Sequence, residues 1–431
     1  MLTIHEREDP KYELALAELS RRGDADLERV EPDVRAILDE VRAGGDAAIR
    51  KLTKRFESRT QDAILVPEER WRARAKEADD AVHAMLSAAA ERIRRYHEQQ
   101  RDPGFRYVED GVELGQRIRP LRSVAVYAPG GKARYPSTVL MTAVPAAVAG
   151  VERIVLVTPR PTPEILAAAT VAGVTEVVDA GGAQAIAAVA YGTETVARVD
   201  KVVGPGNIYV AAAKRLVFGV VDIDSIAGPS EILVIADDDA DPSIVAADLL
   251  SQAEHDEDAY ALLVTLSRAQ ADAVAEAIET RLAELPRKEI AEASLRAHAR
   301  CFVVGDLREA ARVADTLAPE HLALAVRAPD ALLEQIGAAG AAFLGYDTPE
   351  AAGDYVAGPS HVLPTGGAAR FASPLGVYDF VVRTSIIRYG REALEAQGDL
   401  IEGLARLEGL EAHARAVEAR RARDGARPDS E

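Results

Sequence analysis

The pattern of hydrophobic and polar positions differs between the first hundred residues and the rest of the chain. Over the first hundred residues, apolar positions recur at the spacing of amphipathic helices within a heavily charged background. Residues 31–56 are predicted to form two helices separated by Gly44 and Gly45, and residues 81–96 a further helix. We therefore expect residues 1–118 to form a helical N-terminal region that packs on the core.

Beyond residue 118, short apolar runs alternate with alanine-rich helical segments. The first series of predicted strands covers 123–127, 153–158, 176–179 and 201–203. The second series covers 231–236, 260–266, 300–304, 322–326 and 341–344. Apolar runs separated in this way are typical of parallel strands joined by helices on both faces of a sheet. The expected fold class is α/β, with two doubly wound, Rossmann-like parallel-sheet domains and helical extensions at both ends.

The boundary between the two predicted domains falls near Gly228-Pro229. We expect a first α/β domain over 119–228, a second over 229–385, and a C-terminal helical tail over 386–431. The tail is predicted to be helical from about Arg391. In sheets of this kind the carboxyl ends of the strands form the ligand crevice, so the loops after the strands are expected to carry the chemistry.

Composition narrows the class of protein. The 431 residues include 70 acidic and 51 basic ones, and a net charge of −19 disfavours nucleic acid and anionic membranes as partners. The single cysteine, Cys301, excludes an intrachain disulfide and a thiolate metal cluster, and its apolar neighbours predict a buried, inert thiol. The N-terminus lacks a hydrophobic signal core, and the longest uncharged run, 135–151, is interrupted by Pro145. We expect a cytoplasmic protein.

Three glycine-bearing loops follow strands of the first predicted sheet. They are 127–138, which contains Tyr127 and Ser137, 181–184, which ends in Gln184, and 204–207, which ends in Asn207. Gly204-x-Gly206 matches the start of a dinucleotide fingerprint, but Tyr209 occupies the position of the third glycine. Two interpretations remain open: a nucleotide crevice of nonstandard form, or ordinary strand-to-helix turns.

The second predicted domain contains a possible metal-binding pair. Gln252 and His255 are three residues apart in a helix predicted over 248–256, so an amide oxygen and an imidazole nitrogen could reach one zinc ion. A Gln-x-x-His pair on its own is more often a solvated helix face.

Other candidate residues are Ser230 at the expected cleft, Asp354 and His361 in a Gly/Pro-rich loop, and Glu408 and His413 in the C-terminal helices. Glu320 and His321 are adjacent and could serve two separate proton transfers. Each is individually more often structural. However, four of the eight histidines fall in these segments, which favours a metal and acid/base site.

Taken together, the motifs resemble the histidinol dehydrogenase family. The matching segments occur in the family's order and cover roughly residues 30–415. They are Tyr-Ala-Pro-Gly-Gly, Gly-Gly-Ala-Gln-Ala-Ile-Ala, Val-Asp-Lys-Val-Val-Gly-Pro-Gly-Asn, Ala-Gly-Pro-Ser-Glu-Ile-Leu-Val-Ile-Ala-Asp, Asp-Leu-Leu-Ser-Gln-Ala-Glu-His, Pro-Glu-His-Leu and His-Val-Leu-Pro-Thr-Gly-Gly.

The resemblance implies a set of site residues. It implies zinc ligands Gln252, His255, Asp354 and His413, the last from the neighbouring subunit of a homodimer with exchanged C-terminal helices. It implies NAD contacts from Tyr127, Gln184 and Asn207 of the first domain. It implies substrate contacts from Ser137, Ser230, His321, His361 and Glu408, together with the zinc ligands Gln252, His255, Asp354 and His413. The family's acid/base pair matches Glu320 and His321.

The implied reaction oxidises L-histidinol to L-histidinal and, after hydration, to L-histidine, with one hydride passed to NAD at each stage. His321 suits removal of the alcohol proton, because a neutral imidazole is available near pH 7. Glu320 suits deprotonation of the attacking water. Zinc would hold the substrate's imidazole and amino nitrogens, and Glu408 could accept a hydrogen bond from the imidazole's other N–H.

Two alternatives remain. A paralogue of the same fold could oxidise another small alcohol, such as a sulfonated diol, although the presence of Ser230, His361 and Glu408 favours histidinol. A non-catalytic protein could use the zinc only to clamp a dimer, but structural zinc sites are usually rich in cysteine and this chain has one.

Overall fold

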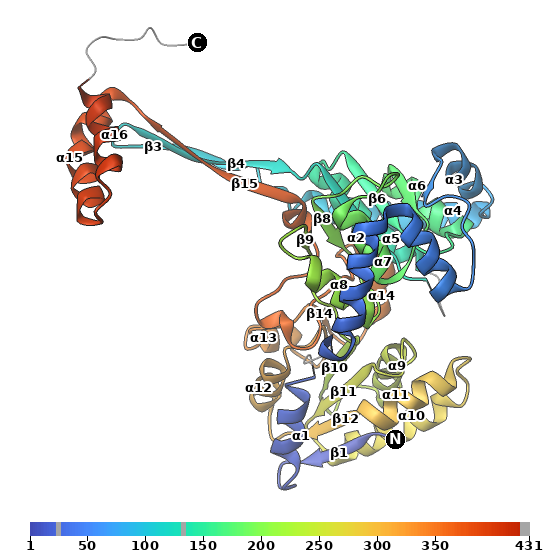
Figure 1. Cartoon of the computed structure of the whole chain (residues 1–431). Coiled ribbons are helices and arrows are strands. Elements are labelled where there is room, and N and C mark those ends of the chain that lie inside the picture. Colours follow the sequence, from blue (N-terminus) through green and yellow to red (C-terminus); the bar gives the residue numbers. More distant parts are fainter. Residues whose placement is uncertain (23–26, 131–134, 423–431) are drawn as a thin grey trace. The chain divides into compact units, whose positions relative to one another are not determined.

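The computed structural model describes residues 1–22, 27–130 and 135–422 (Figure 1). The chain forms two compact units, one of Met1–Arg101 and Leu121–Phe380, the other of Asp102–Pro120 and Val381–Glu431. The first unit contains two six-stranded sheets, and the second contains a three-stranded sheet.

The first sheet has the strand order β2-β7-β6-β5-β8-β9. All neighbouring strands are parallel except β2, which pairs antiparallel with β7. The strands are β2 (Leu65–Val66), β5 (Ser123–Tyr127), β6 (Arg153–Val157), β7 (Glu176–Val178), β8 (Lys201–Val203) and β9 (Asp222–Ile223). The central strand β5 is buried over its whole length, as expected for a parallel strand covered on both faces.

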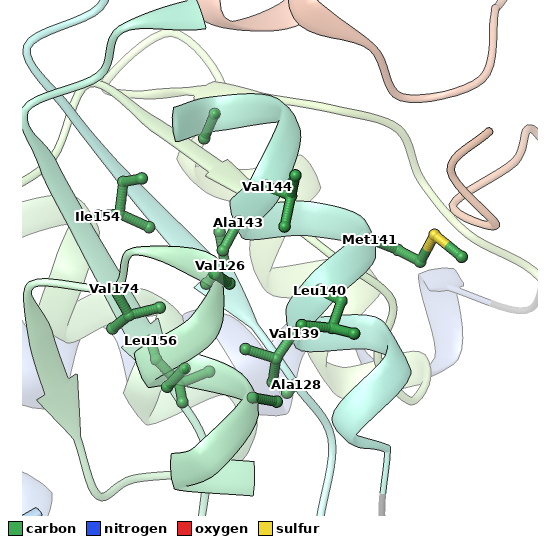
Figure 2. Close-up of a cluster of buried hydrophobic side chains, with 14 of the residues drawn as sticks. Val126, Ala128, Val139, Leu140, Met141, Ala143, Val144, Ile154, Leu156 and Val174 are labelled. Atoms are coloured by element: carbon green, nitrogen blue, oxygen red, sulfur yellow. The ribbon is translucent and has the colours of Figure 1, made fainter. Parts of the chain in front are cut away.

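Helices cover both faces of the first sheet. They are α2 (Leu27–Glu57), α3 (Glu68–Ala75), α4 (Asp80–Glu98), α5 (Pro136–Ala149), α6 (Pro163–Ala172), α7 (Gly182–Tyr191) and α8 (Ile208–Val217). Helices α3 to α6 share one core with Val124 and Val126 of β5, and Figure 2 shows part of this core. Helices α2, α7 and α8 share the other core with Ala125 and Tyr127. The N-terminal helices are therefore part of this domain's own layers.

The prediction of two helices around Gly44 and Gly45 is confirmed. The backbone of α2 leaves helical geometry at Gly45, with φ 50° and ψ −134°, so the segment is two helices joined by a kink. A glycine suits this position because a side chain is strained at positive φ.

The second sheet has the strand order β1-β12-β11-β10-β13-β14, and every pair is parallel. Its strands are β1 (Thr3–Glu6), β10 (Glu231–Ala236), β11 (Tyr260–Thr265), β12 (Arg300–Val303), β13 (His321–Ala325) and β14 (Ala341–Leu344). Its helices are α1 (Tyr12–Leu19), α9 (Pro242–Ala253), α10 (Arg268–Leu282), α11 (Lys288–His298), α12 (Leu307–Leu317), α13 (Pro329–Leu333) and α14 (Glu350–Tyr355), followed by the 3-10 turns η1 (Ala368–Arg370) and η2 (Val377–Phe380).

The fold class predicted from the sequence is confirmed. In each sheet the first strand of the predicted series, β5 or β10, is central, and the chain winds outward to one side and then to the other. This is the order of a doubly wound sheet.

Residues 1–118 contain helices α1 to α4, as expected, but they also contain strands that were not predicted. Strand β1 pairs with β12 from Thr3 opposite Arg300 to Glu6 opposite Val303, and β2, β3 and most of β4 also lie in this region. Strand β1 has only four residues, three of them polar or charged, so its sequence shows no apolar run. Its strand conformation depends on a partner that is distant in the sequence, which local patterns do not reveal.

The second unit contains an antiparallel sheet and two helices. Its elements are β3 (Phe105–Glu109), β4 (Val112–Pro120), β15 (Val381–Tyr389), α15 (Arg391–Leu407) and α16 (Glu411–Arg421). The helices after Arg391 were predicted, but the strands were not, because most of their side chains are exposed on both faces and no alternation results. The turn residues Asp110 and Gly111, both with positive φ, carried the available signal, since Asp-Gly is a frequent hairpin turn.

Two smaller predictions concern Cys301 and membranes. Cys301 is fully buried, and burial raises the pKa of its thiol, as expected for an inert side chain. Among the helices described by the structure, none has the length and apolar character needed to span a bilayer.

Candidate active site

A cavity of about 1000 Å³ lies at the carboxyl edge of the first sheet. The loops after β5, β7 and β8 all contribute to its walls, as expected for the crevice of such a sheet. The three residues singled out in these loops line it: Tyr127, Gln184 and Asn207. The structure thus brings the three glycine-bearing loops together around one space large enough for a dinucleotide. Residues 131–134 of the first loop lie outside the described part of the chain.

Hydrogen bonds fix two of these side chains. The Tyr127 hydroxyl accepts a hydrogen bond from the Gly182 N–H at 3.1 Å, and burial raises the pKa of Tyr127 to about 12. Asn207 caps α8, because its Oδ1 accepts from the N–H groups of Tyr209 and Val210 at 3.1 and 3.2 Å. Asn207 therefore has a structural role whether or not it contacts a ligand.

Gly204 allows β5 and β8 to approach closely. It has φ 110°, and a Cβ placed there would lie 2.3 Å from the Tyr127 carbonyl oxygen. The loop therefore needs this glycine, although the full dinucleotide fingerprint is absent.

Helix α2 also lines the cavity, which the sequence reasoning did not foresee. Its contribution includes Asp33, Glu40, Arg55 and Glu57, and Arg160 adds a further charge from the loop after β6. In the sequence, the charged residues of α2 could not be distinguished from those of an ordinary solvated helix face.

The candidate residues of the second sheet gather at a different edge. Glu320 and His321 lie at the amino end of β13, and Ser230 precedes β10. The expectation that chemistry follows the carboxyl ends of the strands fits the first sheet but does not describe the second. Both Glu320 and His321 are about 5% exposed, so they face the interior of the unit.

Glu231, the first residue of β10, holds both members of this pair. Its backbone N–H donates to Glu320 Oε2 at 2.8 Å, and its Oε1 accepts from the Glu320 N–H at 3.1 Å. Its backbone carbonyl lies 2.9 Å from His321 Nδ1. Because a carbonyl only accepts, Nδ1 of the neutral ring carries the proton and Nε2 keeps a free lone pair.

The environment shifts the pKa values of Glu320 and His321 in opposite directions. Burial, followed by the charge of Glu231, raises the pKa of Glu320 well above its usual value of 4.5. Burial lowers the pKa of His321 to about 4, so its imidazole is neutral at pH 7. The site therefore combines a neutral imidazole with a carboxyl group of raised proton affinity.

Glu350 is a further buried carboxyl group that the sequence reasoning missed. Its Oε1 lies 3.3 Å from His321 Nδ1, and its Oε2 accepts from Ser251 Oγ at 3.4 Å. Burial raises its pKa well above the usual value. Its position at the start of α14 gave no sequence signal. By contrast, Glu231 could have been noticed as the one charged residue in an apolar strand.

Gln252 lies in the last turn of α9 and is completely buried. Neither its Oε1 nor its Nε2 has a hydrogen-bond partner. Because a buried amide without partners is costly, this side chain is suited to a ligand that supplies the missing interaction. A cation bound by the amide oxygen would do so.

The helix predicted over 248–256 extends too far at its C-terminal end. Helix α9 ends at Ala253, and His255 lies in the turn that follows, with its N–H bonded to the Gln252 carbonyl. Five polar or charged residues follow Ala253, and the acidic ones among them disfavour the C-terminal end of a helix. Gln252 and His255 therefore remain neighbours across a turn instead of sharing a helical face.

Asp354 and His361 lie close to the same cluster. His361 Nδ1 donates to the Asp354 carbonyl at 3.1 Å, and His361 Nε2 lies 3.3 Å from Thr138 Oγ1 of α5, next to Ser137. The charges of Asp354 and His255 both act on the pKa values of His321 and His361, which places these four side chains near one another.

Within the described residues, no group of three or more His, Cys, Asp and Glu side chains is arranged to hold a metal ion by itself. A cation in this cluster would therefore depend on the Gln252 amide and on a ligand from elsewhere. The remaining candidates, Glu408 and His413, lie in the second unit, where both are exposed at the junction of α15 and α16.

Known proteins resemble this chain over nearly its whole length. The profile of the family described as histidinol dehydrogenase matches residues 20–421. Histidinol dehydrogenase from Aquifex aeolicus strain VF5 is 52% identical over 417 residues, which are 96% of this chain and 98% of that protein. Histidinol dehydrogenase from Bacillus subtilis strain 168 is 51% identical over 411 residues, 94% of this chain and 96% of that protein. The crystal structure of histidinol dehydrogenase from Elizabethkingia anophelis has a TM-score of 0.91 at 34% identity and covers 97% of this chain and 98% of that one.

Proposed function

Since the chain belongs to the histidinol dehydrogenase family of oxidoreductases, we propose that it oxidises L-histidinol through L-histidinal to L-histidine in two hydride-transfer steps. The observation that carries the proposal is the buried pair of Glu320 and His321, whose proton affinities are shifted in opposite directions. Such a pair supplies two different proton-transfer groups at one place.

His321 acts in the alcohol step. Its Nδ1–H is held by the Glu231 carbonyl, so Nε2 is the free nitrogen that takes the hydroxyl proton as the hydride leaves the carbon. Burial keeps the ring neutral at pH 7, and the base is therefore ready before substrate binds.

Glu320 acts in the aldehyde step. Its carboxylate takes a proton from the water that attacks the aldehyde carbon, and its raised pKa makes it a stronger base than an exposed glutamate. The hydrogen bond from the Glu231 N–H fixes one carboxyl oxygen, which leaves Oε1 for the water.

The proposed cofactors are NAD and zinc. When bound, NAD accepts the hydride and zinc holds the substrate's nitrogen atoms. Tyr127, Gln184 and Asn207, which line the cavity of the first sheet, are the proposed NAD contacts. The proposed zinc ligands are Gln252, His255, Asp354 and His413, and the unpartnered amide of Gln252 supports this choice.

The proposed substrate contacts are Ser137, Ser230, His321, His361 and Glu408, with the zinc ligands Gln252, His255, Asp354 and His413 beside them. We also propose a homodimer in which His413 and Glu408 complete the neighbouring subunit's site. Exposed apolar side chains in the second unit, among them Leu400, Leu404 and Leu407, support such an association. The proposed location is the cytoplasm, and no nucleic acid or membrane is expected to take part.

The test is NADH formation with L-histidinol as substrate, repeated after removal of metal by a chelator and again after addition of zinc. We expect two NADH per histidinol, loss of activity on chelation and recovery with zinc. Activity on another small diol and none on histidinol would instead select the paralogue. Full activity in the metal-free protein would contradict the zinc site.

A further inference from the structure

A buried ion pair lies directly behind the Glu320–His321 pair. Arg22, which follows α1, donates to both carboxylate oxygens of Glu231: its Nε bonds to Oε2, and its Nη2 bonds to Oε1 at 2.5 Å. Both side chains are about 1% exposed. The proposed reaction uses neither side chain.

Arg22 also connects three segments of the chain. Its Nη1 donates to the Leu19 carbonyl at the end of α1, and its Nη2 donates to the Leu317 carbonyl at the end of α12. Leu317 is followed by Ala318, which has a left-handed backbone (φ 44°) and turns the chain toward Glu320. Arg22 therefore braces the segment that delivers Glu320.

The side chain and the backbone of Glu231 both form hydrogen bonds, with Arg22 on one side and with Glu320 and His321 on the other. Its carboxylate faces Arg22, and the same Oε1 also accepts from the Glu320 N–H. Its backbone N–H holds the Glu320 carboxylate, and its carbonyl holds His321 Nδ1. Buried ion pairs are not needed for stability as such, and apolar replacements often match them. Through Glu231 Oε1 this ion pair also holds the backbone N–H of Glu320. Placement of that reacting residue therefore explains the pair better than stability does.

We propose that Arg22 and Glu231 are positioning residues that set the orientation of Glu320 for attack of water on the aldehyde. The inference rests on the proposed roles of Glu320 and His321. The N–H and the carboxylate of Glu320 both bond to Glu231, and the N–H bonds to the carboxylate that Arg22 holds. Of Glu231, His321 bonds only to the backbone carbonyl, which adjoins the pairing of β10 and β13 that starts at Ile232 and His321. The pair therefore controls the aldehyde step more strongly than the alcohol step.

The experiment uses the zinc-loaded full-length enzyme and three changes: Arg22→Lys, Glu231→Gln, and the double change Arg22→Met with Glu231→Gln. The double change avoids an unpaired buried charge, because both partners become neutral. Oxidation of added L-histidinal and single-turnover oxidation of L-histidinol to the aldehyde are measured separately. For the double variant we expect kcat with histidinal to fall by about 10²-fold, with KM changed less than about threefold, because small misplacements of reacting groups have effects of this size. The alcohol step is expected to change less than about threefold, and Arg22→Lys is expected to retain part of the aldehyde rate.

Arg153→Gln is the matched control. Arg153 also donates to both oxygens of a carboxylate, that of Glu176, and to backbone carbonyls, but at the amino ends of strands in the first sheet. It should leave both steps unchanged.

Folded variants with unchanged histidinal oxidation would overturn the inference, as would an equal loss in both steps. Failure of all three variants to fold would also overturn it, because the pair would then serve the fold. Glu320→Gln, measured in parallel, separates this inference from the proposed function. If Glu320→Gln leaves histidinal oxidation intact, the role of Glu320 is wrong; if it alone cripples that step, only the positioning role is wrong.

Discussion

Replacing Glu320 with glutamine removes a buried negative charge while keeping the size and one hydrogen bond of the side chain. The amide oxygen of glutamine can still accept from the Glu231 N–H, as Glu320 Oε2 does at 2.8 Å. The backbone bond from the residue 320 N–H to Glu231 Oε1 is unaffected by the side chain. We therefore expect Glu320→Gln to fold and to bind metal like the parent.

The expected kinetic effect is confined to one step. General base catalysis typically contributes about 10²–10⁴-fold in rate, which corresponds to about 3–5 kcal/mol in the barrier. Oxidation of L-histidinal should fall by that factor, because glutamine cannot take a proton from water. The alcohol step uses His321 and should change less than about threefold.

The assay follows NADH with added L-histidinal and, in single-turnover mode, with L-histidinol. Glu350→Gln is the matched comparison, since Glu350 is a second buried carboxyl group near His321. An equal loss in both steps for Glu320→Gln would refute the division of roles. Loss of the aldehyde step in Glu350→Gln alone would transfer the base role to Glu350.

The same variant also has a predicted pH dependence of stability. The folded-state pKa of Glu320 is raised, mainly by burial, so the folded protein loses stability as pH rises from about 4.5 toward that higher pKa. Glutamine does not ionise, so the free energy of unfolding of the variant relative to the parent should increase over this pH range. Denaturant titrations at several pH values measure the free energy of unfolding of the variant and of the parent. A difference between the two that does not change with pH would contradict a raised pKa of Glu320 in the folded protein.

Three further predictions concern the metal, the cofactor and the fold. His413→Ala should lose zinc, as measured by metal analysis, whereas His298→Ala should retain it; equal metal in both variants would remove His413 from the ligands. Asn207→Ser keeps a capping oxygen and should leave stability within about 0.5 kcal/mol, while Asn207→Ala costs about 1 kcal/mol. Both should raise the KM for NAD, and a change in stability alone would restrict Asn207 to its capping role. Gly204→Ala should destabilise the protein by about 1–3 kcal/mol more than Gly219→Ala in denaturant unfolding, because both glycines have positive φ but only Gly204 touches neighbouring backbone; equal losses would show that the contact relaxes freely.

The two parallel sheets could be predicted because their central strands are buried on both faces and therefore read as continuous apolar runs. Strand β10 is an example, since all six of its residues are buried. Strands β1 and β15 could not be found in this way. The first is too short to show a pattern, and the second has no buried residue, so each depends on its pairing partner.

The site was predicted unevenly for a similar reason. Tyr127 ends a strand, Gln184 and Asn207 come after strands, and the geometry of a doubly wound sheet brings such positions together at one edge. The partners of Glu320 and His321 were harder to foresee. Arg22 and Glu231 are far apart in the sequence, and only the tertiary fold reveals that their charges meet. The resemblance to a known family supplied the residue roles that no spacing could give.

Strand β1 has a consequence for the order of events on the ribosome. It is synthesised well before its partner β12, which begins at Arg300. At roughly 5–20 residues per second, the ribosome needs roughly 15–60 s to make the intervening chain. During that time β1 lacks its partner strand, and the nearby Arg22 lacks its partner Glu231 until β10 has been made. Addition of β1 to the second sheet therefore has to follow synthesis of β12, and a bulky group attached next to β1 would hinder this pairing step during folding.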